Sequence, residues 1–332
     1  MKTERILTLL ILALLALGAV LVQTGHLRLG PIAGTVIRTS VNLQVPPLTD
    51  PAMIRRGAAH YEIVCATCHA SPLSPDRADH LRLTPPAPNL HLRTTDWLPE
   101  VLFLTVKHGI PNTAMPAWPA RNRDDEVWSM VAFLQALPDL DAATYAALSG
   151  RDADMKTAPA PAALCVRCHG TTGRGDASGA FPRLDIQNAA YLLDSLRAYR
   201  AGQRQSGFMA GIVGTLDEAD MALLADYFAA PQSPPTLPEL PATVTSGDTR
   251  PPVAACIACH DPNDVARPAF PRLSGQYPGY LATQLRLFAQ DPFTRGGGPF
   301  ARLMREIAQN LTEAEILAAA IWYGQAGKFL AE

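Results

Sequence analysis

The six cysteines of this chain constrain it more than any other feature. Each belongs to a C-x-x-C pair and none is left over: Cys65 and Cys68, Cys165 and Cys168, Cys256 and Cys259. A histidine directly follows each pair, at His69, His169 and His260. A lone C-x-x-C pair is also compatible with half a zinc site, a redox dithiol or disulfide partners. Three copies with the histidine in the same place favour one chemistry shared by all three.

C-x-x-C-H is the attachment signature of c-type haem. Two sulfur atoms three residues apart on one helical turn reach the two vinyl-derived carbons at one edge of the haem. The next residue then places its imidazole under the iron. The motifs therefore predict three covalently bound haem c groups, with His69, His169 and His260 as proximal iron ligands. A second axial ligand, together with burial, sets the redox behaviour of such an iron.

The sequence contains few candidates for the second ligand of the second and third haems. Beyond His108, the only histidines are those of the motifs. The distal ligand is therefore a methionine, a weaker group, an open site or a histidine from the first haem unit, and methionine is the simplest choice. Met304 is the only methionine after the third motif, whereas Met209 and Met221 both lie between the second and third motifs.

An internal repeat decides between the two methionines of the second unit. Phe181–Leu184 and Phe270–Leu273 both have the sequence Phe-Pro-Arg-Leu, and each is followed by Tyr-Leu and a helical pattern. A loop is expected next, and then Met209 or Met304, each with a leucine seven residues later. This register pairs Met209 with Met304. It leaves Met221 as a core side chain, a common role of methionine.

For the first haem we predict Met115 as the distal ligand. Met115 lies in an irregular, proline-bounded segment between two helical patterns, and loops often carry functional residues. Met130 lies inside a helical pattern, where core packing is its simpler role. The competing histidines are His80, His91 and His108. His108 is the foremost of these, because it precedes a glycine at a predicted helix end.

The N-terminal segment is predicted to attach the chain to a membrane. Ile6 to Val22 is a run of 17 apolar or weakly polar residues preceded by Lys2 and Arg5, and as a helix it is about 26 Å long. This length suits a short membrane span or a signal peptide. Because no good cleavage site follows the run, we favour an uncleaved anchor in residues 1–25. The haem domains then lie in the periplasm, at the inner (cytoplasmic) membrane.

The rest of the chain is predicted to be all-α, with three tandem domains at 51–148, 160–231 and 251–332. No alternating strand pattern of useful length appears. The helical patterns span Trp97–His108, Asp124–Leu137, Tyr191–Ala201, Asp217–Ala229, Tyr280–Ala289 and Thr312–Gly324. Asp50 and Pro51 predict a capped helix leading into the first motif. Prolines stand close before the other two motifs, so those haems are either more exposed or covered by a neighbouring unit.

These features resemble a known family. Each unit resembles a class I c-type cytochrome, a small helical domain with C-x-x-C-H near its start and a distal methionine later. The second and third units resemble diheme cytochromes of the c-four kind, in the Phe-Pro-Arg-Leu and Tyr-Leu segments and the methionine register. This resemblance implies that Arg183 and Arg272 bind haem propionates, with exposed surface arginines as the alternative. The overall plan resembles triheme cytochrome c subunits of membrane-bound dehydrogenases, although an N-terminal anchor is not expected there.

The resemblance implies electron transfer in a respiratory chain, with no catalysis by the chain itself. A dehydrogenase or quinol-linked complex would be the donor, and a terminal oxidase or soluble cytochrome the acceptor. We expect an exposed docking patch near Trp118. The alternative is a multihaem enzyme, a peroxidase or a sulfur-compound oxidoreductase, with one open or labile haem site. A methionine for each iron favours the carrier. A net charge of −2 argues against a nucleic-acid partner.

Overall fold

The computed structural model describes residues 44–76, 82–92, 97–153, 156, 158–176, 178–229, 256–260, 270–290, 295–296 and 298–325. Within these ranges the regular elements are helices, with two isolated β-bridges besides. The all-α prediction is therefore confirmed. No described helix is long and apolar enough to cross a membrane. The anchor predicted in residues 1–25 lies outside the described residues.

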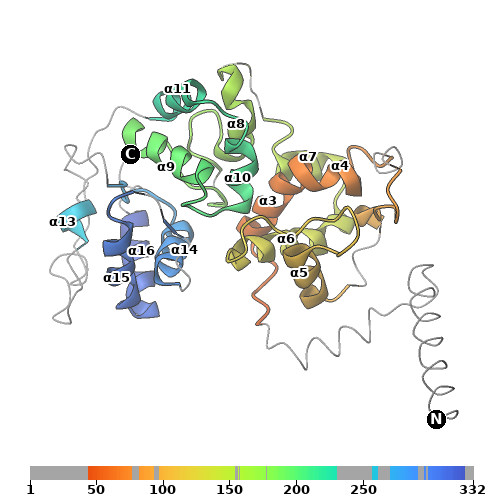
Figure 1. Ribbon diagram of the computed structural model, residues 1–332, viewed down its shortest axis with the longest axis horizontal. Coiled ribbons are helices and arrows are strands. Elements are labelled where there is room, and N and C mark those ends of the chain that lie inside the picture. The colour runs from red at the N-terminus through yellow and green to blue at the C-terminus, as the bar shows by residue number, and fades with distance from the viewer. Residues whose placement is uncertain are drawn as a thin grey trace, which may run out of the picture.

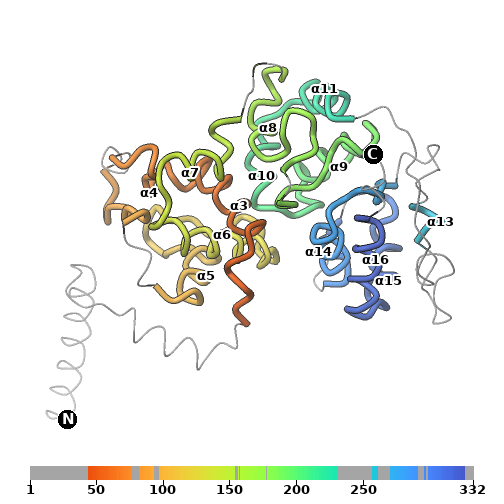
Figure 2. Tube along the Cα trace, turned by 180° about the vertical axis from the view of Figure 1, so that it is seen from behind, coloured from red at the N-terminus to blue at the C-terminus, as the bar shows by residue number. Residues whose placement is uncertain are grey.

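The helices form three groups in chain order, and the second group lies between the other two (Figures 1 and 2). The first group contains α3 (Pro51–His60), η1 (Tyr61–Cys65), α4 (Ala66–His69), η3 (Leu90–Leu92), α5 (Pro99–His108), α6 (Asp124–Ala136), η4 (Leu137–Asp139) and α7 (Ala142–Ser149). The second contains η5 (Ala160–Ala162), α8 (Ala163–His169), α9 (Ala189–Arg200), α10 (Gly207–Val213) and α11 (Glu218–Phe228). The third contains α13 (Ile257–His260), α14 (Pro278–Ala289), α15 (Ala301–Gln309) and α16 (Glu313–Gln325).

Each of the six helical patterns predicted from the sequence corresponds to a helix whose bounds differ by two residues or fewer. The predicted start of α3 is also correct, because the Asp50 carboxylate accepts a hydrogen bond from the Ala52 amide at 2.8 Å. The loop expected before Met209 is present at residues 201–206, but the sequence did not predict the helices that follow. Both methionines lie on helices of their own, α10 and α15, which are only seven and nine residues long. Helices this short leave little periodic pattern in a sequence.

The first group is built on a close crossing of α3 and α6 at Gly57. A methyl group at Gly57 would lie 2.3 Å from the Ser129 carbonyl oxygen and 2.4 Å from the Phe133 Cβ atom. These distances are far shorter than van der Waals contact, so a larger residue forces the two helices apart. The crossing brings Tyr61 and Phe133 to 5.1 Å between ring centroids in a core that also buries Tyr145.

The second and third groups are joined by two reciprocal glutamines. The Gln187 side chain accepts a hydrogen bond from the Arg272 amide at 2.9 Å and donates one to the Arg272 carbonyl oxygen at 2.7 Å. Gln276 makes the same two bonds with Arg183, at 2.9 and 3.0 Å. Both glutamines are buried, so these bonds satisfy polar groups that water does not reach. The repeat in the sequence therefore becomes a two-fold-like junction in space.

The first and second groups meet at an aromatic cluster. The ring centroid of His60, at the end of α3, lies 5.0 Å from that of Trp118 and 5.0 Å from that of Phe208 on α10. Trp118 itself is buried, whereas Pro116, Ala117 and Pro119 beside it are exposed, so the docking patch expected near it stays a prediction. Its indole packs against the neighbouring unit instead of facing solvent. Burial also lowers the pKa of His60 to about 4, which keeps the imidazole neutral at pH 7.

Replacing Gly57 tests the helix crossing. Gly57→Ala should lower the free energy of unfolding by about 1–3 kcal/mol, because overpacking outweighs the better helix propensity of alanine. Thermal or urea unfolding of the holoprotein measures this change. Gly279→Ala is the matched control, since a methyl group at Gly279 on α14 meets nothing within 4 Å. Equal stability of the two variants would contradict the crossing described above.

His60 should make the junction sensitive to acid. Its ordinary pKa is 6.5 and its folded pKa is about 4, so between these values the unfolded chain binds a proton that the folded chain does not. The free energy of unfolding therefore falls as the pH is lowered, and this group accounts for a loss of about 2 kcal/mol between pH 7 and pH 5. His60→Phe keeps an aromatic ring and should remove that part of the loss. Unfolding of both proteins at the two pH values tests this, and equal losses would refute it.

Candidate functional site

Each motif histidine ends a short helix and is oriented by a proline carbonyl group. The Nδ1 atoms lie 3.0, 3.0 and 2.9 Å from the carbonyl oxygens in the pairs His69–Pro88, His169–Pro182 and His260–Pro271. Because a carbonyl oxygen only accepts, each Nδ1 carries the proton and each Nε2 presents a lone pair. Burial lowers the pKa of all three imidazoles. The histidines are therefore neutral, as metal ligation requires.

The sequence analysis did not predict that prolines bind the motif histidines, although the sequence around two of these prolines is repeated. Pro182 and Pro271 are the prolines of the two Phe-Pro-Arg-Leu segments, so the repeat itself marks their role. Pro88 has no such segment around it. It follows His69 by 19 residues, against 13 and 11 residues in the other two units. Only the folded chain shows that all three have the same function.

The second and third motifs open into one cavity of 380 Å³. Its lining includes the motif and methionine residues Cys165, His169, Met209, Cys256, Cys259, His260 and Met304. The structure thus brings each predicted pair of axial ligands in these units to a common space. These are His169 with Met209, and His260 with Met304.

A neighbouring unit covers the second motif, which is one of the two alternatives left by the prolines before it. A smaller cavity is lined by Cys165, Cys168, His169 and Met209 together with Arg56, His60 and Ile63 of the first group. Ala59 of α3 also packs in one cluster with Phe181 and Cys168. The first unit therefore forms part of the wall of the second site.

Positive charge lines the large cavity at the junction of the second and third groups. The arginines that line this part of the cavity are Arg183, Arg204, Arg272 and Arg295. The Arg204 guanidinium donates to the Tyr280 hydroxyl at 2.7 Å, and the Arg295 guanidinium donates to the Tyr191 hydroxyl at 3.5 Å. Burial opposes ionisation of Tyr191, but the two guanidinium groups outweigh it and lower the pKa of this phenol to about 8. Such a wall suits carboxylates, including haem propionates.

The residues at the third motif fit a haem. In the part of the chain that the structure describes, His260 Nε2 and Arg272 Nη1 are buried atoms without a hydrogen-bond partner. Buried polar atoms of this kind are costly unless another group binds them. Iron suits the imidazole nitrogen and a propionate suits the guanidinium. Arg183, the equivalent of Arg272, instead forms an ion pair with Asp185 at 2.6 Å. Neither arginine is fully exposed.

The predicted ligands of the first haem, His69 and Met115, do not line either of the two cavities described above. Met115 is half-buried, and its backbone bonds within its own loop, to the Ile110 amide and the Thr113 hydroxyl, at 3.1 Å each. Among the competing histidines, the Nδ1 atom of His91 lies 3.1 Å from the Leu137 carbonyl oxygen, and His108 is exposed. His80 lies outside the described residues. Met115 therefore stays a prediction as the first distal ligand.

The other methionines in question have the roles expected of them. Met130 on α6 and Met221 on α11 are buried, with exposed fractions of 1% and 0%. Met130 belongs to the core of the first group. The aromatic residues Trp128, Phe133 and Trp322 are core side chains as well. Met209 and Met304 line the large cavity, whereas Met130 and Met221 are not among its lining residues.

Comparison with known proteins agrees with this site. The profile of the family described as cytochrome C oxidase, cbb3-type, subunit III matches residues 52–134. A thiosulfate dehydrogenase electron acceptor from Thiomonas intermedia is 32% identical in an alignment of 180 positions that covers 51% of this chain and 82% of that protein. Cytochrome c4 from Pseudomonas aeruginosa is 32% identical in an alignment of 173 positions that covers 50% of this chain and 85% of that protein. The solved cytochrome c4 structure from Acidithiobacillus ferrooxidans is 31% identical, with a TM-score of 0.41, and the match covers 48% of this chain and 97% of that chain.

Sequence identity across most of a cytochrome c4 agrees with the features of the folded chain. Its described elements are helical, and each of its three cysteine pairs leads into a neutral histidine with a fixed Nδ1 proton. Three such pairs are consistent with three haems. The chain therefore belongs to the class I c-type cytochromes of the cytochrome c4 kind and is a multihaem electron carrier.

Proposed function

We propose that this chain is a triheme cytochrome c that relays single electrons at the periplasmic face of the inner membrane. One repeated observation carries the proposal. Directly after each cysteine pair stands a neutral histidine whose Nδ1 proton is held by a proline carbonyl group. Haem c, when bound, supplies a one-electron iron couple. The chain's own residues attach it, orient its ligands and exclude water from it.

The proposal gives each unit the same set of residues. The thioether attachments are Cys65 and Cys68, Cys165 and Cys168, and Cys256 and Cys259. The axial pairs are His69 with Met115, His169 with Met209, and His260 with Met304. An imidazole and a thioether are both neutral ligands, and a methionine ligand raises the reduction potential of a haem. The three domains at 51–148, 160–231 and 251–332 each hold one such set.

The arrangement of the cavities supports a relay through the second and third units. The predicted ligands of both units line the same cavity of 380 Å³. The reciprocal bonds of Gln187 and Gln276 hold the two walls of this cavity together. A fixed separation suits electron transfer, since the carrier then has no conformational change to make at each step.

The similar proteins bear on the partners. A relative named for accepting electrons from thiosulfate dehydrogenase favours a dehydrogenase over a quinol-linked complex as the donor. The match of residues 52–134 to a family described as an oxidase subunit favours a terminal oxidase over a soluble cytochrome as the acceptor. Catalysis then belongs to the partners and not to this chain. An N-terminal anchor in residues 1–25 is part of the proposal and keeps the relay at the membrane.

Haem count and carbon monoxide binding test the proposal together. The mass of the mature holoprotein should correspond to three covalent haems, and the fully reduced protein should take up no carbon monoxide at native pH. Three closed six-coordinate irons explain both results. Visible spectroscopy follows the uptake. Binding by one haem of the unmodified protein would instead favour an enzyme with an open or labile site.

Replacing a distal methionine should open one iron. Met304→Ala and Met209→Ala should each keep three covalent haems and bind one carbon monoxide per reduced chain, because the thioether ligand is missing. Met221→Leu is the matched control, since it changes a buried methionine with nearly constant volume and should bind none. Spectroscopic titration of the three variants measures the stoichiometry. No uptake by either alanine variant would contradict the ligand assignment.

A further inference from the structure

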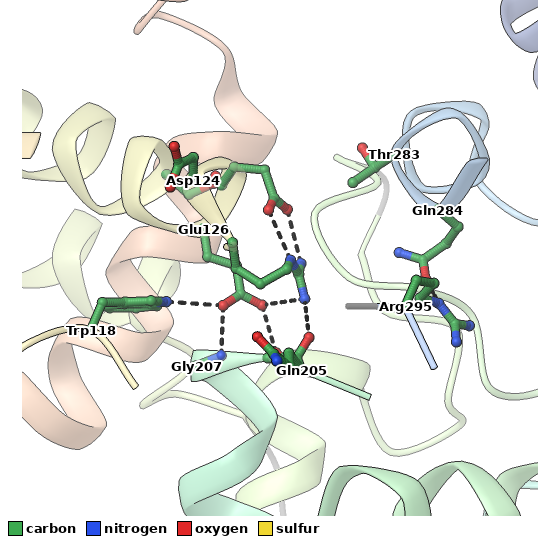
Figure 3. Close-up of polar contacts among 12 residues, drawn as sticks. Trp118, Asp124, Glu126, Gln205, Gly207, Thr283, Gln284 and Arg295 are labelled. Atoms are coloured by element: carbon green, nitrogen blue, oxygen red, sulfur yellow. Dashed lines mark hydrogen bonds and ion pairs between the residues drawn. The ribbon is translucent and has the colours of Figure 1, made fainter. Parts of the chain in front are cut away.

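A buried carboxylate of the first unit binds the start of the helix that carries Met209. Glu126 lies on α6 with an exposed fraction of 1%. One carboxylate oxygen accepts a hydrogen bond from the Ser206 hydroxyl at 2.6 Å. The other accepts from the Gly207 amide at 2.6 Å and from the Trp118 indole at 3.1 Å. Figure 3 shows the carboxylate between Trp118 and Gly207, with its hydrogen bonds drawn.

Arg123 strengthens the same contact. Its guanidinium lies 2.8 Å from the Glu126 carboxylate and donates to the Gln205 carbonyl oxygen at 2.7 Å. Two further bonds, at 2.8 and 2.9 Å, join it to Asp125. The ion pair offsets part of the cost of burying the Glu126 carboxylate, although burial is the larger effect and raises its pKa. Residues 205–207 of the second unit are therefore held by side chains of the first.

The contact reaches the ligand residue through one hydroxyl group. Ser206 is the N-cap of α10, and its hydroxyl oxygen accepts a hydrogen bond from the Met209 amide at 3.2 Å while it donates to Glu126. The backbone of α10 also touches the first unit directly, because a methyl group at Gly207 would lie 2.4 Å from the Trp118 ring. The start of α10 cannot shift away from α6 without breaking these contacts.

The third unit lacks this arrangement at its equivalent helix. Met304 lies on α15, whose N-cap position is Phe300, and no side-chain hydrogen bond caps that helix. Glu126 and Arg123 line the cavity that contains both methionines, but the bonds of Glu126 go to the Met209 side. The two repeated units thus differ in how firmly their methionine helices are held.

We propose that Glu126 is a positioning residue for the distal ligand of the second haem, and that it strengthens the bond between Met209 and iron from within the first unit. The inference rests on the proposed assignment of Met209 as that ligand. A carboxylate that only joined the two units would affect stability alone. A positioning carboxylate also changes how readily another ligand displaces Met209.

Carbon monoxide competition measures this displacement in the reduced holoprotein. Glu126→Gln keeps the shape of the side chain but removes its charge, and a neutral acceptor makes weaker hydrogen bonds. The comparison with the unmodified protein is made at carbon monoxide pressures high enough to compete with its methionine ligands, and there the apparent affinity of one haem should rise about tenfold. The charge-transfer absorption of methionine-ligated ferric haem should weaken by less than the full contribution of one haem, because Met209 stays the ligand but is bound less firmly.

Double variants identify which haem responds. Glu126→Gln combined with Met209→Ala should bind no more carbon monoxide than Met209→Ala alone. Combined with Met304→Ala, it should show a second haem with raised affinity. If Met209→Ala binds none, the ligand assignment fails. If it binds one equivalent while Glu126→Gln behaves as the unmodified protein does, only the positioning role fails.

A matched control separates positioning from a general loss of stability. Glu62 is another buried carboxylate of the first unit, and it accepts a hydrogen bond from the Tyr145 hydroxyl at 2.7 Å, away from α10. Glu62→Gln should leave the carbon monoxide affinity of the second haem within about twofold. The same rise in Glu62→Gln as in Glu126→Gln would overturn the proposal.

Should Glu126→Gln fail to fold, Ser206→Ala removes the bridging hydroxyl and should raise the affinity in the same way. An unchanged affinity in Ser206→Ala would then overturn it.

Discussion

The hydrogen bond from a histidine Nδ1 atom to a proline carbonyl group is the interaction on which each site depends. It decides which nitrogen carries the proton, and it sets the rotation of the imidazole ring. Burial keeps the ring neutral. The short helix that contains the cysteines and the segment that contains the proline must therefore come together before a site exists. The packing of each unit can be understood as the means of holding these two segments in place.

The three units are similar, but the structure does not use them in the same way. The second unit has neighbours on both sides (Figures 1 and 2). On one side Arg56, His60 and Ile63 of the first unit close its small cavity. On the other side it shares a large cavity with the third unit. Residues of both neighbours therefore surround the haem site of the second unit. Haem sites with the same motif thus differ in their surroundings.

Much of the fold was predictable from the sequence, because the signals are local. Period and capping identified α3, α5, α6, α9, α11, α14 and α16, and the repeat paired Met209 with Met304. The contacts between units were not predictable. Glu126 is 80 residues from Ser206, and Gln276 is 93 residues from Arg183, so no short pattern joins them. The burial of Trp118 was not predictable for the same reason, since the chain near it does not show that Phe208 of α10 packs against it.

The reciprocal glutamines have a consequence for how this chain can vary during evolution. Each amide binds the backbone N–H and C=O groups of an arginine in the other unit, and not its side chain. Backbone groups are the same in every residue except proline. Natural variation at Arg183 and Arg272 can therefore tune the charge of the cavity while the junction persists. Gln187 and Gln276 have less freedom, because a side chain without both a donor and an acceptor leaves an N–H or C=O group of this partly buried junction unpaired.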